Sequence, residues 1–168
     1  MRVVERPSLK AMNSFGVATS AALLLVIERE EDVLTLPPFD PARDFMLGGG
    51  SNVVFATDVP GTVYHNAILG RAVVEDGADH GLLEVGAGEN WHGLVRWTLE
   101  HGYSGLENLS LIPGLSGAAP LQNIGAYGVE LAERFESLSA YDSSSQVRVT
   151  LDAEQCRFGY RDSVFKQE

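Results

Sequence analysis

Short apolar or alternating runs, each bounded by Gly, Pro, Asn or Asp, recur along most of the chain. Runs of this length with turn residues at their ends predict β-strands. The predicted strands are residues 22–27, 45–47, 52–56, 62–66, 72–75 and 82–85. Two further runs, 135–141 and 146–151, flank the polar stretch 142–145, and the second alternates apolar and polar residues. This arrangement predicts a β-hairpin.

One stretch has the spacing of an amphipathic helix instead. Between Trp91 and Leu99 the apolar side chains recur every three or four residues, which is the period of one face of an α-helix. Asn90 can cap the first turn, and Gly102 can end the last one. The pattern therefore predicts a helix over residues 90–101.

The longest apolar run, Ala21 to Ile27, is far shorter than the roughly 20 residues that a membrane-spanning helix needs. It has the length of a signal-peptide core, but the charged stretch 28–32 follows it in place of a small-residue cleavage site. We therefore expect a buried strand that leads into a polar helix start. Prolines at positions 37, 38 and 41 break that helix. The sequence predicts a cytoplasmic protein with no membrane partner.

Composition narrows the possible functions. A chain of 168 residues suffices for one domain or two small ones, and its hydrophobic content of 45% excludes a disordered polypeptide. Twelve Lys and Arg against 23 Asp and Glu give a formal net charge of −11. Nucleic acids and anionic membranes favour basic patches, so neither is an expected partner. The single cysteine, Cys156, can form no internal disulfide, and the four histidines show no metal-binding spacing. We expect a buried Cys156, no metal and no obligate protein partner.

The chain has eighteen glycines, well above average usage, and many lie in two segments without Lys or Arg, residues 44–70 and 102–128. The first segment contains the run Gly48, Gly49, Gly50, Ser51 and Asn52, between two apolar stretches. Three consecutive glycines exceed what a two-residue hairpin turn needs. Their amides can also form a concave nest that binds an anion. A glycine-rich hairpin and an anion nest both remain open.

The second segment combines a Pro113-Gly114 turn with small residues at 116–119 and with amide and tyrosine side chains at 122–127. Small residues allow another molecule to approach the backbone closely. A helix that begins after Gly117 would direct its N-terminal amides outward, where they could bind a phosphate without a basic side chain. Tight packing of backbone inside a core is the alternative.

Two shorter motifs carry further hypotheses. GAGENW at 86–91 is similar to a dinucleotide-binding fingerprint, but Trp91 stands where the third glycine belongs and would block close packing of helix on strand. We therefore predict a strand, a tight turn and a capped helix there. In FGYRDS at 158–163, Arg161 lies between an aromatic residue and a carboxylate, and it can stabilise a developing enolate or carboxylate. A surface turn that pairs Arg161 with Asp162 is the alternative.

Six motifs follow one another along most of the chain in a characteristic order. They are NSFG at 13–16, LGGGSN at 47–52, VGAGENW at 85–91, GLENLSLIPG at 105–114, PLQNIGAYGVEL at 120–131 and CRFGYRDSVFK at 156–166. Together they resemble the UDP-N-acetylenolpyruvoylglucosamine reductases of bacterial peptidoglycan synthesis, also called UDP-N-acetylmuramate dehydrogenases.

The resemblance implies an α+β fold of the vanillyl-alcohol-oxidase (PCMH) type, in which two small α/β subdomains hold FAD between them. The expected boundaries are 1–66 for the first FAD-binding subdomain and 67–168 for the second. Members of this family continue for about as many residues again. The resemblance therefore implies the amino-terminal, FAD-binding half of such a reductase, without its substrate domain.

The resemblance also implies roles for individual residues. The glycine-rich run at 48–52 would hold the FAD pyrophosphate, in agreement with the nest argument. The remaining expected FAD contacts are Ile112, Pro113, Gly114, Gly117, Ala118, Asn123, Gly125 and Tyr127. Arg161 matches the catalytic arginine of the family, and Tyr160 and Arg161 are expected to bind the substrate.

The implied reaction has two halves: NADPH reduces FAD, and the flavin then passes hydride to the enolpyruvyl group of the UDP-sugar. The proton-donating serine and a second catalytic glutamate would lie outside this chain. We expect non-covalent FAD, because neither glycine-rich motif has a nearby His or Cys to tether it. One departure from the family is Ala118-Ala119, which removes two possible hydroxyl donors. A flavin-binding fragment without reductase activity and another flavoprotein oxidoreductase of the same fold remain as alternatives.

Overall fold

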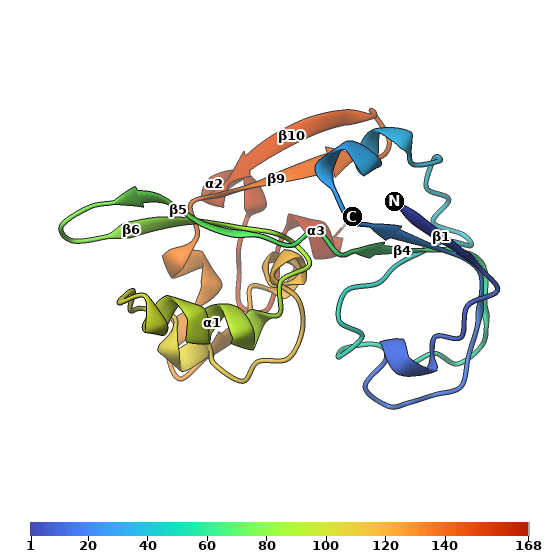
Figure 1. Ribbon diagram of the computed structural model, residues 1–168, viewed down its shortest axis with the longest axis horizontal. Coiled ribbons are helices and arrows are strands. Elements are labelled where there is room, and N and C mark those ends of the chain that lie inside the picture. The colour runs from blue at the N-terminus through green and yellow to red at the C-terminus, as the bar shows by residue number, and fades with distance from the viewer. Residues whose placement is uncertain (168) are drawn as a thin grey trace.

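The computed structural model describes residues 1–167. A four-stranded sheet lies to the right in Figure 1, helix α1 lies to the left, and the hairpin β9–β10 runs across the top. The strands are β1 (Arg2–Glu5), β2 (Ala21–Ile27), β3 (Phe45–Met46), β4 (Val59–Asn66), β5 (Arg71–Asp76), β6 (Gly81–Val85), β7 (Gly125–Ala126), β8 (Val129–Glu130), β9 (Ser137–Asp142) and β10 (Val147–Asp152). The α-helices are α1 (Trp91–Glu100), α2 (Ala153–Cys156) and α3 (Val164–Gln167). The 3₁₀ turns are η1 (Lys10–Met12), η2 (Glu30–Thr35), η3 (Glu107–Leu109), η4 (Ser116–Ala118), η5 (Pro120–Gln122) and η6 (Leu131–Arg134).

The largest sheet has the strand order β1-β2-β4-β3. Strand β1 runs antiparallel to β2, whereas β2, β4 and β3 run parallel to one another. The last four residues of β2 are all buried, as expected for an inner strand of a parallel sheet that is covered on both faces. This sheet carries the first hydrophobic core, whose buried members are Leu9, Ala21, Leu24, Val26, Leu47 and Val63.

Helix α1 builds the second core. Its apolar face is buried, and the Asn90 side chain accepts a hydrogen bond from the Gly93 amide at 2.8 Å, which starts the helix. The buried members of this core are Trp91, Leu94, Val95, Leu109, Ala119, Ile124 and Leu131. The two cores draw on separate stretches of the chain, and the domain boundary between residues 66 and 67 stays a prediction.

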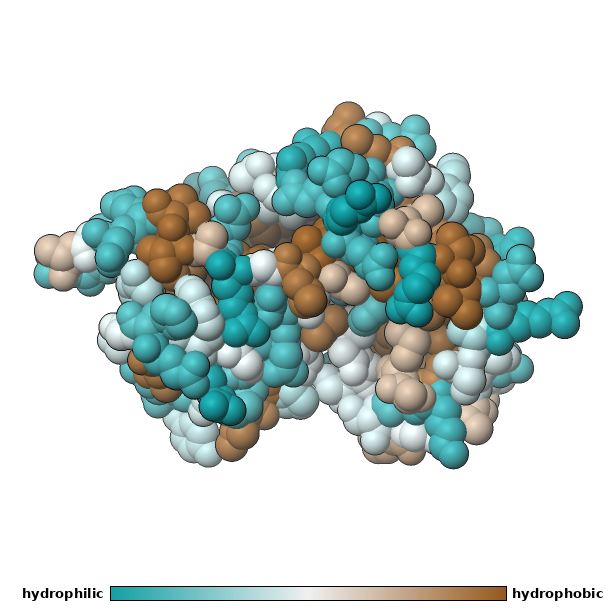
Figure 2. Space-filling view, in the orientation of Figure 1, coloured by the Kyte–Doolittle hydropathy of each residue, from teal (hydrophilic) through white to brown (hydrophobic). Residues whose placement is uncertain are grey.

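Two antiparallel hairpins extend from these cores. Hairpin β5–β6 projects from the body of the molecule (Figure 1), and Figure 2 shows apolar side chains on its surface. Hairpin β9–β10 reaches back toward the first sheet, because Arg148 on β10 forms an ion pair with Glu30 of η2. No helix among residues 1–167 is long and apolar enough to span a membrane.

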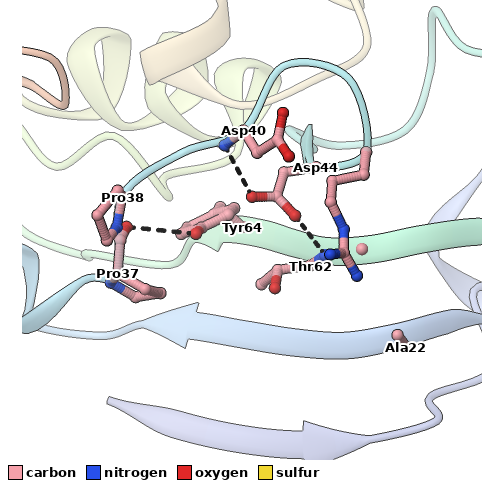
Figure 3. A pocket seen from close by; sticks show the side chains of 9 residues that line it. Ala22, Pro37, Pro38, Asp40, Asp44, Thr62 and Tyr64 are labelled. Carbon is pink, nitrogen blue, oxygen red and sulfur yellow. Dashed lines mark hydrogen bonds between the residues drawn. The ribbon is translucent and has the colours of Figure 1, made fainter.

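The connection from β2 to β3 contains little regular secondary structure, as its prolines predict. The 3₁₀ turn η2 ends at Thr35, and the chain then returns to the edge of β4, where the Asp44 carboxylate accepts hydrogen bonds from the Thr62 amide at 2.8 Å and the Asp40 amide at 3.0 Å. The Tyr64 hydroxyl donates to the Pro37 carbonyl at 3.4 Å. A shallow pocket of about 300 Å³ remains beside these residues (Figure 3).

Most of the predicted elements are confirmed, including the helix, the hairpin over 135–151 and five of the six single strands. The strand predicted over 52–56 is wrong, because these residues form a turn and irregular backbone. Val53 and Phe55 nevertheless pack against the first core while Val54 is exposed, which explains the alternating pattern. The buried Cys156 is confirmed. The pattern missed β1, which pairs with β2 at the edge of the sheet.

Candidate functional site

The glycine-rich run 48–52 lies directly against the segment that begins at Pro113. The Ser51 hydroxyl donates to the Pro113 carbonyl at 3.4 Å. A Cβ atom on Gly49 would lie 3.0 Å from the Gly114 Cα, and one on Gly48 would lie 3.2 Å from the Ala118 Cβ. Two segments more than 60 residues apart therefore meet at a junction where only very small residues fit.

The amides of the glycine-rich run have the freedom that an anion nest requires. The Leu47 amide still donates to the Tyr64 carbonyl at 2.8 Å, at the end of the sheet. Beyond it, within residues 1–167, the amides of residues 48–52 donate to no protein acceptor. Gly50 has a φ of 67°, and a Cβ there would overlap the Met12 carbonyl oxygen, so only glycine fits where the loop packs on residues 12–13. Because no strand follows, the hairpin alternative is excluded.

The segment around residues 116–122 does not form the predicted helix with outward-pointing amides. Residues 116–118 and 120–122 form only two short 3₁₀ turns. The Ser116 amide donates to the Glu89 carbonyl at 2.8 Å, and the Gly117 amide donates to the Ala87 carbonyl at 2.9 Å. The outward-pointing helix start is therefore wrong, because the turn before α1 already provides acceptors for these amides.

The motif at 86–91 forms the predicted strand, tight turn and capped helix. Its glycines pack on protein backbone: the Gly86 amide donates to Gly70 and the Gly88 amide to Ile68, both at 2.8 Å. The Glu89 carboxylate accepts from Arg71 Nε at 2.8 Å and from the Gly70 amide at 3.0 Å. Burial alone would raise the pKa of the Glu89 carboxyl, but these hydrogen bonds outweigh it and hold that pKa below its ordinary value.

A second group of predicted residues surrounds Arg161. Its guanidinium donates to the carbonyls of Gly125 and Asn123, and Asp162 accepts instead from Gln167 Nε2 at 2.5 Å. The alternative of an Arg161–Asp162 surface pair is therefore excluded. Carbonyl partners leave the positive charge of Arg161 without a carboxylate partner among the described residues.

Arg161 lines a pocket of about 350 Å³. The other lining residues are Gly125, Ala126, Tyr127, Gly128, Val129, Glu130, Glu133 and Tyr160. Tyr127 and Tyr160 are 87% and 84% exposed, so both rings are available to a ligand. The structure thus brings two of the expected cofactor contacts together with the two expected substrate-binding residues.

The buried Asn123 side chain joins the segments around Arg161 through hydrogen bonds. It is 1% exposed, and its side-chain nitrogen donates to Glu130 Oε2 at 2.8 Å and to the Gly159 carbonyl at 3.0 Å. Its side-chain oxygen accepts from the Ala132 amide at 3.0 Å. Both amide hydrogens are used inside the protein and the side chain is buried, so any contact of Asn123 with a cofactor would come from its backbone. The expected contact of Asn123 with FAD stays a prediction.

Sequence reasoning missed the residues that support these segments. Glu89 and Trp91 lie in the motif at 86–91, where the sequence predicts a tight turn and a capped helix but no contact with another loop, and His92 has no metal-binding spacing. Glu130 lies in the motif at 120–131, and the sequence predicts no role for it. The acceptor and donor positions that these residues supply arise from contacts between distant segments, which a single sequence does not display.

Comparison with known proteins decides what kind of domain this is. The family model described as "FAD binding domain" matches residues 42–150. The chain belongs to this FAD-binding family. The matched range contains both the glycine-rich run at 48–52 and the segment at 112–127. The cofactor of the family is FAD.

Curated relatives carry a more specific name. The UDP-N-acetylenolpyruvoylglucosamine reductase of Azoarcus sp. (strain BH72) is 52% identical over 167 residues, which cover 95% of this chain and 48% of that protein. The protein of the same name from Pseudomonas aeruginosa is 48% identical over 171 residues, covering 100% of this chain and 50% of that protein. The chain spans about half the length of the curated relatives it matches.

A solved structure agrees with these relatives. The UDP-N-acetylenolpyruvylglucosamine reductase (MurB) of Thermus caldophilus superposes with a TM-score of 0.75 at 31% identity, over 97% of this chain and 57% of that one. The resemblance of the sequence to this family of reductases and the α+β, PCMH-type fold are both confirmed.

The residues present fit FAD. The amides at 48–52 have no protein acceptor among the described residues and are available to a pyrophosphate, a side chain on Gly49 would press on the Gly114 backbone, and the φ of 128° at Gly114 disfavours any other residue there. Residues 44–70 contain no Lys or Arg, so the partial positive charges of backbone amides would stabilise the charge of the phosphates.

Proposed function

We propose that this chain is the FAD-binding part of a cytoplasmic reductase that converts UDP-N-acetylglucosamine enolpyruvate to UDP-N-acetylmuramate, with NADPH as reductant, in peptidoglycan precursor synthesis. The observation that carries the proposal is the junction of the free-amide loop at 48–52 with the small residues at 113–118. The relatives that share this sequence over most of its length are named for that reduction.

Each segment has its own task in this proposal. The amides of Gly48, Gly49, Gly50, Ser51 and Asn52 bind the pyrophosphate. The flavin is lined by Ile112, Pro113, Gly114, Gly117 and Ala118, together with the backbone near Asn123, Gly125 and Tyr127. When bound, FAD supplies hydride transfer from NADPH to the enolpyruvyl group. The two subdomains meet along the cofactor, with their boundary between residues 66 and 67.

Arg161 is the catalytic residue that this chain contributes. Its guanidinium donates to two backbone carbonyls, forms no ion pair with the Glu130 or Glu133 carboxylates that line the same pocket, and is therefore available to an anionic group bound there. Such a group stabilises the negative charge that develops on the enolpyruvyl group more strongly than it stabilises the uncharged ground state. Tyr160, whose ring centroid lies 5.8 Å from the Arg161 guanidinium carbon, binds the substrate beside it.

A narrower function is also open: the chain binds flavin but performs no reduction by itself. The coverage of about half of each curated relative favours this second candidate. An oxidase of the same fold with a covalent flavin is a third candidate. The motifs at 47–52 and 111–128 contain no His or Cys, but His65 Nδ1 lies 2.9 Å from the Leu47 carbonyl and His92 Nδ1 lies 3.2 Å from the Leu111 amide, so acid precipitation of the protein decides between the two kinds of attachment.

The test is a titration of the purified chain with FAD, followed by its absorbance spectrum. We expect a saturable, perturbed flavin spectrum, and release of all flavin when the protein is precipitated with acid. Gly49→Ala places a methyl group 3.0 Å from the Gly114 Cα, and it should weaken FAD binding by about tenfold or more.

The matched control is Gly77→Ala at the turn of hairpin β5–β6, where an added Cβ would lie 3.0 Å from the His80 carbonyl oxygen, the same separation as at Gly49 but outside the junction. Its FAD affinity should equal that of the unmodified chain. Absence of FAD binding by a folded chain would refute the proposal. Flavin that stays with the precipitated protein would refute only the non-covalent attachment.

A further inference from the structure

Two consecutive residues at the start of α1 hold the flavin-lining segment at three points. Trp91 Nε1 donates to the Leu109 carbonyl at 2.8 Å, and the Trp91 amide donates to the Gly114 carbonyl at 3.1 Å. Between them, the Leu111 amide donates to His92 Nδ1 at 3.2 Å. Both ends and the middle of the segment 109–114 are therefore hydrogen-bonded to the first turn of α1.

The middle bond lies where the backbone is under strain. Leu111 has a φ of 62°, in the left-handed region that side chains other than glycine and asparagine rarely adopt. Its side chain is 76% exposed, so burial of the leucine does not offset this cost. The hydrogen bond to His92 is thus the contact that favours the left-handed conformation.

This bend determines where the junction lies. Two residues after Leu111, the Pro113 carbonyl accepts from Ser51, and Gly114 then lies against Gly49. Because Trp91 holds both ends of the segment, a change of φ at Leu111 would reorient residues 112 and 113 between these ends and would shift the lining of the flavin relative to the glycine-rich run.

We propose that His92 is a positioning residue for the flavin: its neutral imidazole, protonated at Nε2, accepts the Leu111 amide at Nδ1 and so fixes the segment 111–114 against residues 48–52. The proposal rests on the proposed function, since FAD is the ligand of that junction. His92 itself touches neither the glycine-rich run nor the Arg161 pocket in any described contact.

The same helix offers a matched control. His101 also uses Nδ1, 2.8 Å from the Trp97 carbonyl, and stacks on the Trp97 ring with centroids 4.3 Å apart. It lies at the opposite end of α1 from the clamped segment. Loss of its imidazole tests the general effect of removing a histidine from this helix.

The experiment compares His92→Leu, His92→Asn and His101→Leu in the full chain. Asn Oδ1 can take the place of His Nδ1 as acceptor, whereas Leu removes the acceptor. We measure three quantities: the tautomer of His92 by ¹⁵N NMR, the exchange rate of the Leu111 amide, and the dissociation constant for FAD. We expect an Nε2-protonated ring in the unmodified chain.

His92→Leu should speed exchange of the Leu111 amide and weaken FAD binding by about three- to tenfold, the range of one lost hydrogen bond. His92→Asn should restore most of both, and His101→Leu should match the unmodified chain. A proton on Nδ1, equal exchange in all variants, or no difference between the Leu and Asn variants at position 92 would overturn the proposal.

Failure of the proposed function gives a different result. If the unmodified chain binds no FAD, that function is wrong, and the Leu111 amide then decides the positioning role alone. Protection that is lost in His92→Leu and kept in His92→Asn supports it, and equal exchange overturns it.

Discussion

At the scale of single residues, the buried amide of Asn123 connects three segments that surround the Arg161 pocket. Its nitrogen donates to Glu130 and Gly159, and its own carbonyl accepts from Arg161. In Asn123→Asp the donor is replaced by a carboxylate 2.8 Å from that of Glu130. We expect the free energy of unfolding at pH 7 to fall by about 2–4 kcal/mol, because a buried charge faces a like charge and a carbonyl.

Urea denaturation measures this loss, and Asn108→Asp is its control. Asn108 is exposed and donates to the Tyr127 carbonyl at 3.2 Å, so the same chemical change there should cost little. Equal stability of the two aspartate variants would show that the Asn123 hydrogen bonds do not organise the pocket.

At the scale of elements, the first turn of α1 supports both its own helix and the segment 109–114. The Asn90 side chain caps this turn through the Gly93 amide. Asn90→Ala should lower the free energy of unfolding by about 1 kcal/mol, as other lost caps do. Asn90→Asp keeps an acceptor at the positive end of the helix and should retain the stability of the unmodified chain in urea. A destabilised aspartate variant would contradict a capping role.

Element prediction from the sequence succeeded where one physical signal dominated. The helix at 90–101 and the inner strand β2 show a clear period or a long apolar run, and both form as predicted. The run at 52–56 failed because alternation reports which side chains are buried, not whether a neighbouring strand is available. Val53 and Phe55 contact the first core without pairing to any strand.

For the candidate site, too, the sequence predicted some features and could not show others. Three adjacent glycines predicted that something approaches the backbone closely, and Gly49 does meet Gly114. The sequence could not show that the partner is another loop of the same chain. Nor could it show that the Ser116 and Gly117 amides are used by residues 87–89, because those bonds join segments about 30 residues apart.

At the scale of the whole molecule, charge opposes association while exposed apolar side chains favour it. The net charge is −11, and the sequence pI is about 4.7. Among the described residues, large apolar side chains with more than half their area exposed include Phe15, Val54, Leu69 and Leu111, and Figure 2 shows apolar surface in several places on one face. Repulsion between copies weakens near the pI and at high salt, whereas apolar attraction persists.

We therefore expect the chain to bind a hydrophobic dye at pH 7 and to associate increasingly as the pH falls toward 4.7 or as salt is raised. Light scattering and size-exclusion chromatography measure the association. The double change Val54→Ser with Leu69→Ser removes two side chains that are 71% and 68% exposed, so it should lower dye binding and association at constant charge. A chain that stays monomeric and silent to the dye near pH 4.7 would show that these side chains form no adhesive surface, and that charge alone does not limit association.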